Sequence, residues 1–149
     1  MTKFFIKYVD KYTIISNVDS ISSVFLLALK DSKILAIKNE RGWDISGGHV
    51  EEGETPEEAL IREIQEEAGA SFLDAKLLAV VESDNEDKYK DKVMLVYTTD
   101  NFTLGEFTPS EDSFDREVIE VEDFLLRYKD HFDFIEMIIR AKQLFKKID

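Results

Sequence analysis

Three acidic residues, spaced three and four positions apart, carry the strongest chemical signal in the sequence. Glu63, Glu66 and Glu67 are related as i, i+3 and i+4, and residues at that spacing lie on one face of a helix. Three like charges so close repel one another, so they are either solvated or hold a hard divalent cation between them. Arg62, adjacent in sequence, can fix a carboxylate by two parallel hydrogen bonds. The spacing predicts a helix with a candidate cation site; the alternative is an ordinary solvated face.

The residues around these acids predict where that helix begins and ends. Thr55 can cap the first turn, Pro56 suits the first helical position, and Glu58 can complete a capping box. Gly69 stands where a left-handed C-terminal cap is expected. Apolar residues fall on a neighbouring face, so we expect the helix to pack one side on the core and to present its acids on the other. These apolar residues are Leu60, Ile61, Ile64 and Ala68.

The wider spacing favours chemistry over a solvated face. The pattern starts at Gly48, reaches Glu54 after five intervening residues and Arg62 after seven more. Over Gly48–Ala70 it resembles, at every position, the signature of the Nudix hydrolases, Gx5Ex7REUxEExGU, where U is aliphatic or small. At average residue usage, seven fixed identities coincide by chance at on the order of one in 10⁸ starting positions, and the acidic composition of the chain raises that chance by about one or two decades. We therefore identify the chain, by resemblance, as a member of that family.

The length of the chain predicts one domain over residues 1–149. The expected strands, hairpins and few helices indicate an α+β or layered α/β/α architecture. The resemblance implies the Nudix-type α/β/α sandwich, with a mixed β-sheet and the box helix on one side. Expected turns are Asp31-Ser32 and the acidic loop Asp84–Asp91. Helices are expected at Glu122–Tyr128 and along the apolar stripe Phe134, Met137, Ile138, Ala141, Leu144, Phe145 and Ile148. The expected strands are Phe4–Val9, Tyr12–Ser16, Val24–Leu29, Ile34–Lys38, Leu77–Ser83 and Val93–Thr99.

Two segments outside the box extend the resemblance. Family members usually have proline at the place of Ser46, and the serine predicts a looser turn before Gly47. The acidic run Glu111–Val118 resembles a segment that often supplies another metal ligand or a base, which makes Glu111 or Asp112 a candidate. The resemblance covers roughly residues 20–127.

The resemblance implies hydrolysis of a nucleoside diphosphate linked to another moiety, with Mg²⁺ or Mn²⁺ as the cofactor. A cation agrees with the charge of the chain, because 32 acidic against 19 basic residues give a net charge of −13, which opposes an anionic pyrophosphate. Either Glu63 or Glu66 would activate water, while Glu54 and Arg62 orient the loop and helix through an ion pair. The expected metal ligands are Glu63, Glu66, Glu67, the Gly47 carbonyl and Asp112. The expected catalytic set is Glu63, Glu66, Arg62 and Glu54, and the expected substrate-binding residues are Lys38 and Gly48.

Several substrates are compatible with this motif. The first is a nucleoside triphosphate, including a modified one; the alternatives are ADP-ribose, a nucleotide sugar or a dinucleoside polyphosphate. A third hypothesis, from a different functional class, is a Nudix-fold ligand sensor that binds its ligand without hydrolysing it. Trp43, Phe25 and Phe107 could stack on a base, although single aromatic residues on strands are more often core. His49 and His131 are interpreted as non-catalytic.

Composition excludes other classes of function. The chain has no cysteine, which rules out disulfides and cysteine-based metal centres. The acidic balance argues against nucleic acid and anionic membranes as partners. The longest apolar run, Val24 to Leu29, is far shorter than a membrane span. We expect a cytoplasmic protein with a small nucleotide as partner, and a homodimer is compatible with the sequence.

Overall fold

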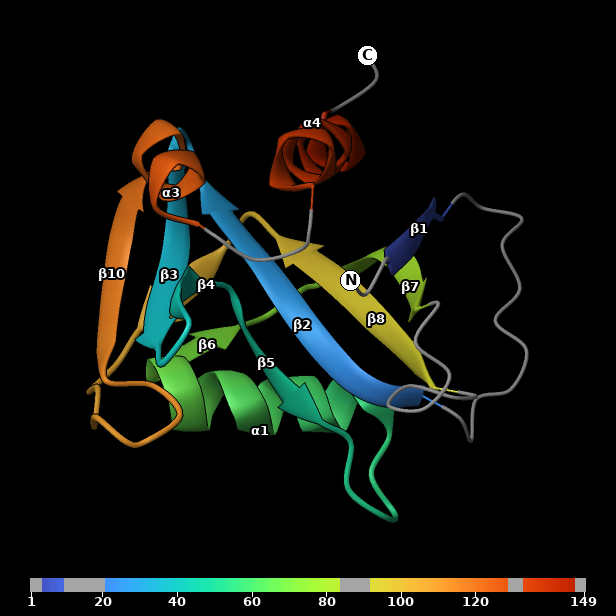
Figure 1. Ribbon diagram of the computed structural model, residues 1–149, viewed down its shortest axis with the longest axis horizontal. Helices are drawn as coiled ribbons and strands as arrows, with labels where there is room; N and C mark the ends of the chain where they lie inside the picture. The colour runs from blue at the N-terminus through green and yellow to red at the C-terminus, as the bar shows by residue number, and fades with distance from the viewer. Residues whose placement is uncertain (1–3, 10–20, 84–91, 129–132, 147–149) are drawn as a thin grey trace.

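The computed structural model describes residues 4–9, 21–83, 92–128 and 133–146 (Figure 1). Ten strands and three helices are assigned within these ranges. The strands are β1 (Phe4–Tyr8), β2 (Ile21–Lys30), β3 (Lys33–Asn39), β4 (Gly42–Asp44), β5 (Ser46–His49), β6 (Ala70–Phe72), β7 (Lys76–Ser83), β8 (Val93–Thr99), β9 (Phe102–Leu104) and β10 (Asp115–Glu120). The helices are α1 (Pro56–Ala68), α3 (Val121–Arg127) and α4 (Phe134–Phe145).

A mixed sheet forms the centre of the molecule, with strand order β1-β7-β8-β2-β3-β10. In the part of the chain that the structure describes, β2 and β8 are the one parallel pair, and the other ladders are antiparallel. Strand β5 pairs with β2, and β4 pairs with β3, while β6 and β9 form a separate two-stranded sheet. Strand β5 thereby lies beside β2 and next to α1 (Figure 1).

Two hydrophobic cores lie on the two faces of the sheet, because alternate residues of a strand point to opposite sides. On β2, Leu26 belongs to the core that includes Leu60 and Ile64 of α1. Its neighbour Leu27 belongs to the core built with Phe124 of α3 and Phe134 of α4. Helix α1 thus covers one face while α3 and α4 cover the other (Figure 1). The predicted α/β/α sandwich with the box helix on one side is confirmed.

Helix α1 has the ends that the sequence predicts. The Thr55 side chain accepts a hydrogen bond from the Glu58 backbone N–H, and the Glu58 carboxylate accepts one from the Thr55 N–H. Gly69 closes the helix in the left-handed conformation, with φ of 59°. The expected apolar face is wrong at one position, because Ile61 is 58% exposed while Ala59 is buried.

The predicted strands and helices within the described ranges are present, with ends that shift by a few residues. Asp31-Ser32 forms the expected turn between β2 and β3, and the predicted helix at Glu122–Tyr128 is α3. The expected strand Tyr12–Ser16, the loop Asp84–Asp91, His131 and Ile148 lie outside the described residues. Within those ranges, none of the helices combines the length and apolar character needed to cross a bilayer.

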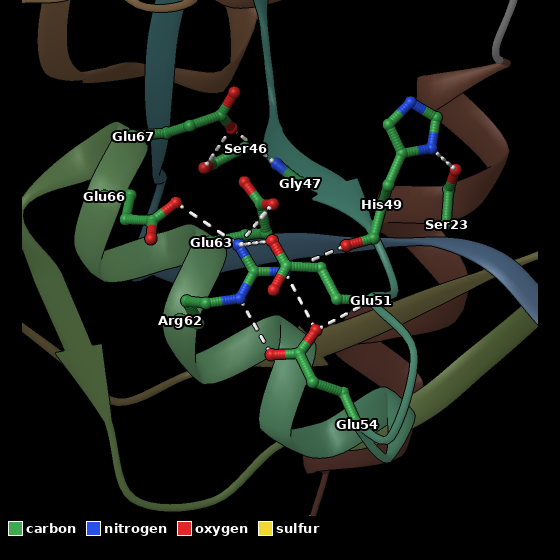
Figure 2. Close-up of polar contacts among 10 residues, drawn as sticks. All are labelled: Ser23, Ser46, Gly47, His49, Glu51, Glu54, Arg62, Glu63, Glu66 and Glu67. Carbon is green, nitrogen blue, oxygen red and sulfur yellow. Dashed lines mark hydrogen bonds and ion pairs between the residues drawn. The ribbon is translucent and has the colours of Figure 1, made fainter.

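The expectation that the acids lie opposite the packed side of α1 is wrong for two of them. Ala59, Glu63 and Glu67 form a row at four-residue spacing, which places both acids on the same side as a buried alanine. This row faces strand β5. Glu67 lies beside Ser46 and Gly47 of that strand, while the carboxylates of Glu63 and Glu66 turn toward Arg62 (Figure 2). The exposed fraction is 15% for the Glu63 side chain and 60% for that of Glu66.

Candidate active site

Arg62 is the hub of a hydrogen-bond network at the middle of α1 (Figure 2). Its Nε and Nη2 donate to the two carboxylate oxygens of Glu54 at 2.7 and 2.9 Å. Its Nη1 donates to Glu63 at 2.8 Å and to Glu66 at 3.2 Å, and Nη2 also donates to the His49 carbonyl at 3.0 Å. A guanidinium has five N–H donors, and these contacts engage all of them. Arg62 therefore positions other groups and has no donor left for a phosphate.

The predicted ion pair between Glu54 and Arg62 is confirmed, and it closes the loop that precedes α1. The Glu51 backbone N–H donates to Glu54 at 2.9 Å, and Gly53 allows this tight turn because its φ is +86°. Hydrogen bonds from Arg62 and Glu51 lower the pKa of Glu54 to about 2. The same contacts raise the pKa of Arg62, chiefly through Glu54. The charged forms of both residues are thus the stable ones at neutral pH.

Glu63 lies against strand β5, and Gly48 makes room for it. A Cβ atom at position 48 would come within 2.3 Å of the Glu63 carboxyl carbon, so any larger residue would displace the carboxylate. Gly48 is a residue of strand β5, and its lack of a side chain allows this close approach. Burial raises the pKa of Glu63, although Arg62 pulls it in the opposite direction.

Glu67 is held by neutral donors. The Ser46 hydroxyl donates to Glu67 Oε1 at 2.8 Å, and the Gly47 backbone N–H donates to the same oxygen at 2.9 Å. Burial raises the pKa of Glu67 to about 7; the two hydrogen bonds oppose this rise, and the charges of Glu63 and Asp112 add to it. The position of Ser46 was expected to be a loose turn. It is a buried strand residue tied to the helix.

Residues just before and within β10 bind the last turn of α1. The Ser113 hydroxyl donates to the Glu67 carbonyl at 2.8 Å. Arg116 Nη1 donates to the carbonyls of Ala68, Gly69 and Gly105 at 2.9, 3.2 and 2.9 Å. A cation at these carbonyls satisfies groups that a helix end leaves unpaired and opposes the negative end of the helix dipole. Asp112, next to Ser113, thereby comes within electrostatic reach of Glu67.

Lys38, a predicted substrate-binding residue, is not brought together with the acids. Leu35 and Ile37 of β3 belong to the core on the α1 side, so strand alternation places Lys38 on the opposite face. Its Nζ lies 5.8 Å from the centre of the Trp43 ring, and Arg127 lies 5.4 Å from the same ring. Lys38 and Trp43 thus form a separate basic and aromatic group on the α3 side of the sheet.

The acids fit a hard divalent cation by their chemistry. Among the described residues, no three acidic or histidine side chains converge closely enough to enclose a metal ion on their own. Magnesium commonly takes only one or two carboxylates and completes its shell with water and substrate phosphate. Glu63 and Glu67 offer two such carboxylates side by side. In an extended strand the N–H and C=O of one residue point to the same side, so the Gly47 carbonyl faces these acids as its N–H does.

Sequence reasoning missed three side chains that build this site, namely the Ser46 hydroxyl as a donor, Ser113 and Arg116. Ser113 and Arg116 lie inside the acidic run that the resemblance had singled out. No local pattern links them to α1, because their partners are more than 40 residues away in sequence. Phe107, considered for base stacking, lies beneath the guanidinium of Arg116 at 5.4 Å.

Comparisons with known proteins agree with this geometry. The family model for the NUDIX domain matches residues 20–140. An ADP-ribose pyrophosphatase of Methanocaldococcus jannaschii is 33% identical over 118 residues, which cover 76% of this chain and 69% of that protein. An 8-oxo-dGTP diphosphatase of Proteus vulgaris is 45% identical over 47 residues, 32% of this chain and 42% of the relative.

A solved structure supports the fold. The crystal structure of a Bacillus subtilis pyrophosphohydrolase aligns with a TM-score of 0.71 at 21% identity, covering 95% of this chain and 91% of that one. Identity at this level speaks for shared architecture alone. The family match is independent of it and spans most of the chain. The chain therefore belongs to the Nudix hydrolases, which generally use a divalent metal.

Proposed function

We propose that the chain hydrolyses a pyrophosphate bond in a nucleoside diphosphate linked to another moiety, with Mg²⁺ or Mn²⁺ as cofactor. The observation that carries the proposal is the environment of Glu67. Its carboxylate lies against β5 and accepts hydrogen bonds only from neutral donors, and burial raises its pKa to about 7. A carboxylate in that setting gains from a cation supplied from outside. An anionic pyrophosphate gains from the same cation, so one ion would satisfy both.

The residues divide into ligands and positioning groups. The metal ligands in this proposal are Glu63, Glu66, Glu67, the Gly47 carbonyl and Asp112. When bound, a divalent cation polarises phosphate oxygens and lowers the pKa of a water molecule. Glu63 or Glu66 accepts the proton of the attacking water. Each of these two accepts a hydrogen bond from Arg62, which sets the direction of its carboxylate.

Arg62 and Glu54 serve the reaction by holding the loop and helix together. Their contact uses both carboxylate oxygens of Glu54, so neither residue is free to touch the substrate. Gly48 contributes by leaving space beside Glu63. Lys38 and Trp43 lie on the opposite face of the sheet from the acids, so the phosphate contact predicted for Lys38 is not part of this proposal.

The substrate class is tested directly by a panel of nucleotides. We would incubate the protein with ADP-ribose, nucleotide sugars, dinucleoside polyphosphates, and ordinary and oxidised nucleoside triphosphates, in Mg²⁺ and in Mn²⁺. Products would be separated by ion-exchange chromatography. Turnover that requires metal and disappears in Glu67→Gln supports the proposal. Saturable ligand binding with no turnover of any panel member would identify a sensor and overturn it.

One observation favours ADP-ribose as a second, narrower candidate. The relative named for ADP-ribose matches 76% of this chain, whereas the relative named for 8-oxo-dGTP matches 32%. Broad similarity includes more of the strands and loops that contact the part of a substrate beyond the pyrophosphate. If this candidate is right, kcat/KM in the panel will be highest for ADP-ribose.

A further inference from the structure

The side chain of Ser46 makes a contact that the proposed reaction has not yet used. Ser46 is 2% exposed, and its hydroxyl donates to Glu67 Oε1 at 2.8 Å across 21 positions of sequence. A buried hydroxyl needs a partner, and here the partner is a carboxylate that we place at the metal. Figure 2 shows the contact beside that of the Gly47 N–H, on one oxygen of Glu67.

Both donors act on the same oxygen atom. Oε1 accepts from Ser46 and from Gly47 at 2.8 and 2.9 Å, whereas Oε2 accepts no hydrogen bond from any residue that the structure describes. The backbone of Glu67 is fixed as well, because the fully buried Ser113 hydroxyl donates to its carbonyl at 2.8 Å. Glu67 is thus held at its backbone and at one carboxylate oxygen, and the other oxygen is left for a ligand.

The type of donor matters as much as its position. Arg62 neutralises the acids that it binds, but a hydroxyl and an amide N–H orient a carboxylate while leaving its full negative charge. Such a carboxylate keeps its attraction for a cation and loses little rotational freedom when the cation arrives. Hydrogen-bond partners of metal ligands commonly act in this way.

We propose that Ser46 is a positioning residue that turns Glu67 so that Oε2 alone faces the metal, making Glu67 a ligand through a single oxygen. This inference rests on the proposed function, since it assumes that Glu67 binds the cation. The hydroxyl belongs to this chain in particular, because proline, the usual residue of family members at this place, has no hydroxyl to donate. The geometry thus assigns a local role to a position where the chain departs from the family pattern.

The test is a direct titration with Mn²⁺, followed by electron paramagnetic resonance of the free ion and requiring no substrate. We would compare Ser46→Ala, Ser46→Cys and Ser46→Thr with the unmutated protein. Loss of the hydroxyl in Ser46→Ala should raise the Kd for Mn²⁺ about tenfold, the lower end of the roughly 10–100-fold range typical when partners of metal ligands are removed. Ser46→Cys, close to serine in size but a weak donor, should behave like Ser46→Ala and serves if the alanine variant fails to fold. Ser46→Thr keeps a hydroxyl and should stay within about threefold of the unmutated protein.

A matched control comes from the neighbouring strand. Ser23 is also a buried serine, and its hydroxyl contacts His49 Nδ1 at 3.3 Å. Ser23→Ala removes a hydroxyl of the same kind without touching Glu67, so the Kd for Mn²⁺ should not change. In substrate assays, Ser46→Ala should recover its turnover as Mn²⁺ is raised, with KM for the nucleotide unchanged.

The outcomes separate this inference from the proposed function. Unchanged Mn²⁺ affinity in Ser46→Ala or Ser46→Cys, together with lost affinity in Glu67→Gln, would overturn the role of Ser46 and leave the metal site standing. Equal losses in Ser46→Thr and Ser46→Ala would show that packing, not the hydroxyl, matters, and would also overturn it. If the unmutated protein binds no Mn²⁺, the proposed function and this inference fail together.

Discussion

The acids of α1 and of the loop before it fall into two groups with opposite kinds of partner. Around Arg62, a guanidinium supplies the counter-charge, and the pKa of Glu54 falls to about 2. One turn further along, Glu67 receives only a hydroxyl and an amide, and its pKa rises to about 7. Glu63 lies between the two, since it accepts a hydrogen bond from Arg62 while burial still raises its pKa.

This contrast distinguishes Glu54, whose counter-charge the protein supplies, from Glu67, which receives only neutral hydrogen-bond donors. Burying an ionised group without a partner is costly, and the protein avoids that cost at Glu54 by providing its own cation. It does not avoid it at Glu67, which receives hydrogen bonds only from the neutral Ser46 hydroxyl and Gly47 N–H. Perturbed groups that folding alone does not need are typical of functional sites. The comparison therefore supports the proposal that the cation binds at the Glu67 end of the helix.

The largest expected effect comes from removing the charge at that end. Glu67→Gln keeps an oxygen for Ser46 and Gly47 but loses the negative charge, so metal-dependent kcat should fall by more than about 100-fold. The same change should stabilise the metal-free protein at pH 8. The folded pKa of Glu67 is raised, so the unmutated protein loses stability as the pH rises from about 4.5 to about 7. Thermal unfolding without metal should show a gain of a few degrees.

A control on another helix makes this result specific. Glu122 is an exposed residue of α3, and Glu122→Gln should leave both kcat and the unfolding temperature unchanged. Mg²⁺ should raise the unfolding temperature of the unmutated protein, because it binds the folded state, and should not raise that of Glu67→Gln. A Glu67→Gln protein of full activity would contradict the division between the two groups.

The next largest effect is expected from weakening the Arg62 network. Lysine is a point charge and cannot replace the five donors of Arg62, so Arg62→Lys should lower kcat about 10–100-fold. It should also reduce the free energy of unfolding by about 1–3 kcal/mol, measured by urea denaturation. Arg140→Lys is the matched control, since Arg140 pairs with Glu136 at 2.9 Å on the surface of α4 and exposed pairs contribute about 0–1 kcal/mol. Equal losses in the two variants would show that the Arg62 network has no special role.

Local chemistry explains what the sequence could predict. The capping box of α1 and the left-handed Gly69 depend on residues within one turn of each other, and both are present as predicted. The Glu54–Arg62 pair lies eight positions apart within one motif and was also foreseen. Strand β5 was not foreseen because Ser-Gly-Gly-His has no alternating apolar pattern, and it becomes a strand by pairing with β2.

The division of the acids could not be predicted from helix geometry alone. Spacing places Glu63, Glu66 and Glu67 near one another, but which of them is buried depends on where β5 crosses the helix. The two glycines of β5 reflect this close packing. A Cβ at Gly48 would meet Glu63, and one at Gly47 would meet the backbone of Val24. Arg116 and Ser113 contact α1 from a distant part of the sequence, and the spacing of residues along the sequence does not predict such contacts.

A smaller effect is expected from removing the contacts that Arg116 makes with the C-terminal end of α1, close to Glu67. Arg116→Met removes the donor to the carbonyls of Ala68 and Gly69 at the end of α1, and to the Gly105 carbonyl beside it. We expect a loss of about 1–2 kcal/mol in the free energy of unfolding, and faster amide hydrogen exchange in the last turn of α1 than in its first. Arg41→Met, at an arginine that is 71% exposed, should change neither measurement. Uniformly faster exchange along α1 would mean that Arg116 supports the whole helix and not this end of it.

The smallest expected effect is a change in how steeply the free energy of unfolding depends on pH in acid. The folded pKa of Glu54 lies near 2 and its ordinary value is 4.5, so its contribution to stability is complete above pH 4.5 and disappears as the pH falls toward 2. Glu54→Gln lacks this contribution, so the variant should be less stable than the unmutated protein at neutral pH and equally stable near pH 2. Urea denaturation at intervals of pH would show the two curves converging. Parallel curves over that interval would mean that Arg62 stabilises the loop without depending on the charge of Glu54, and the contrast between the two ends of α1 would lose its electrostatic basis.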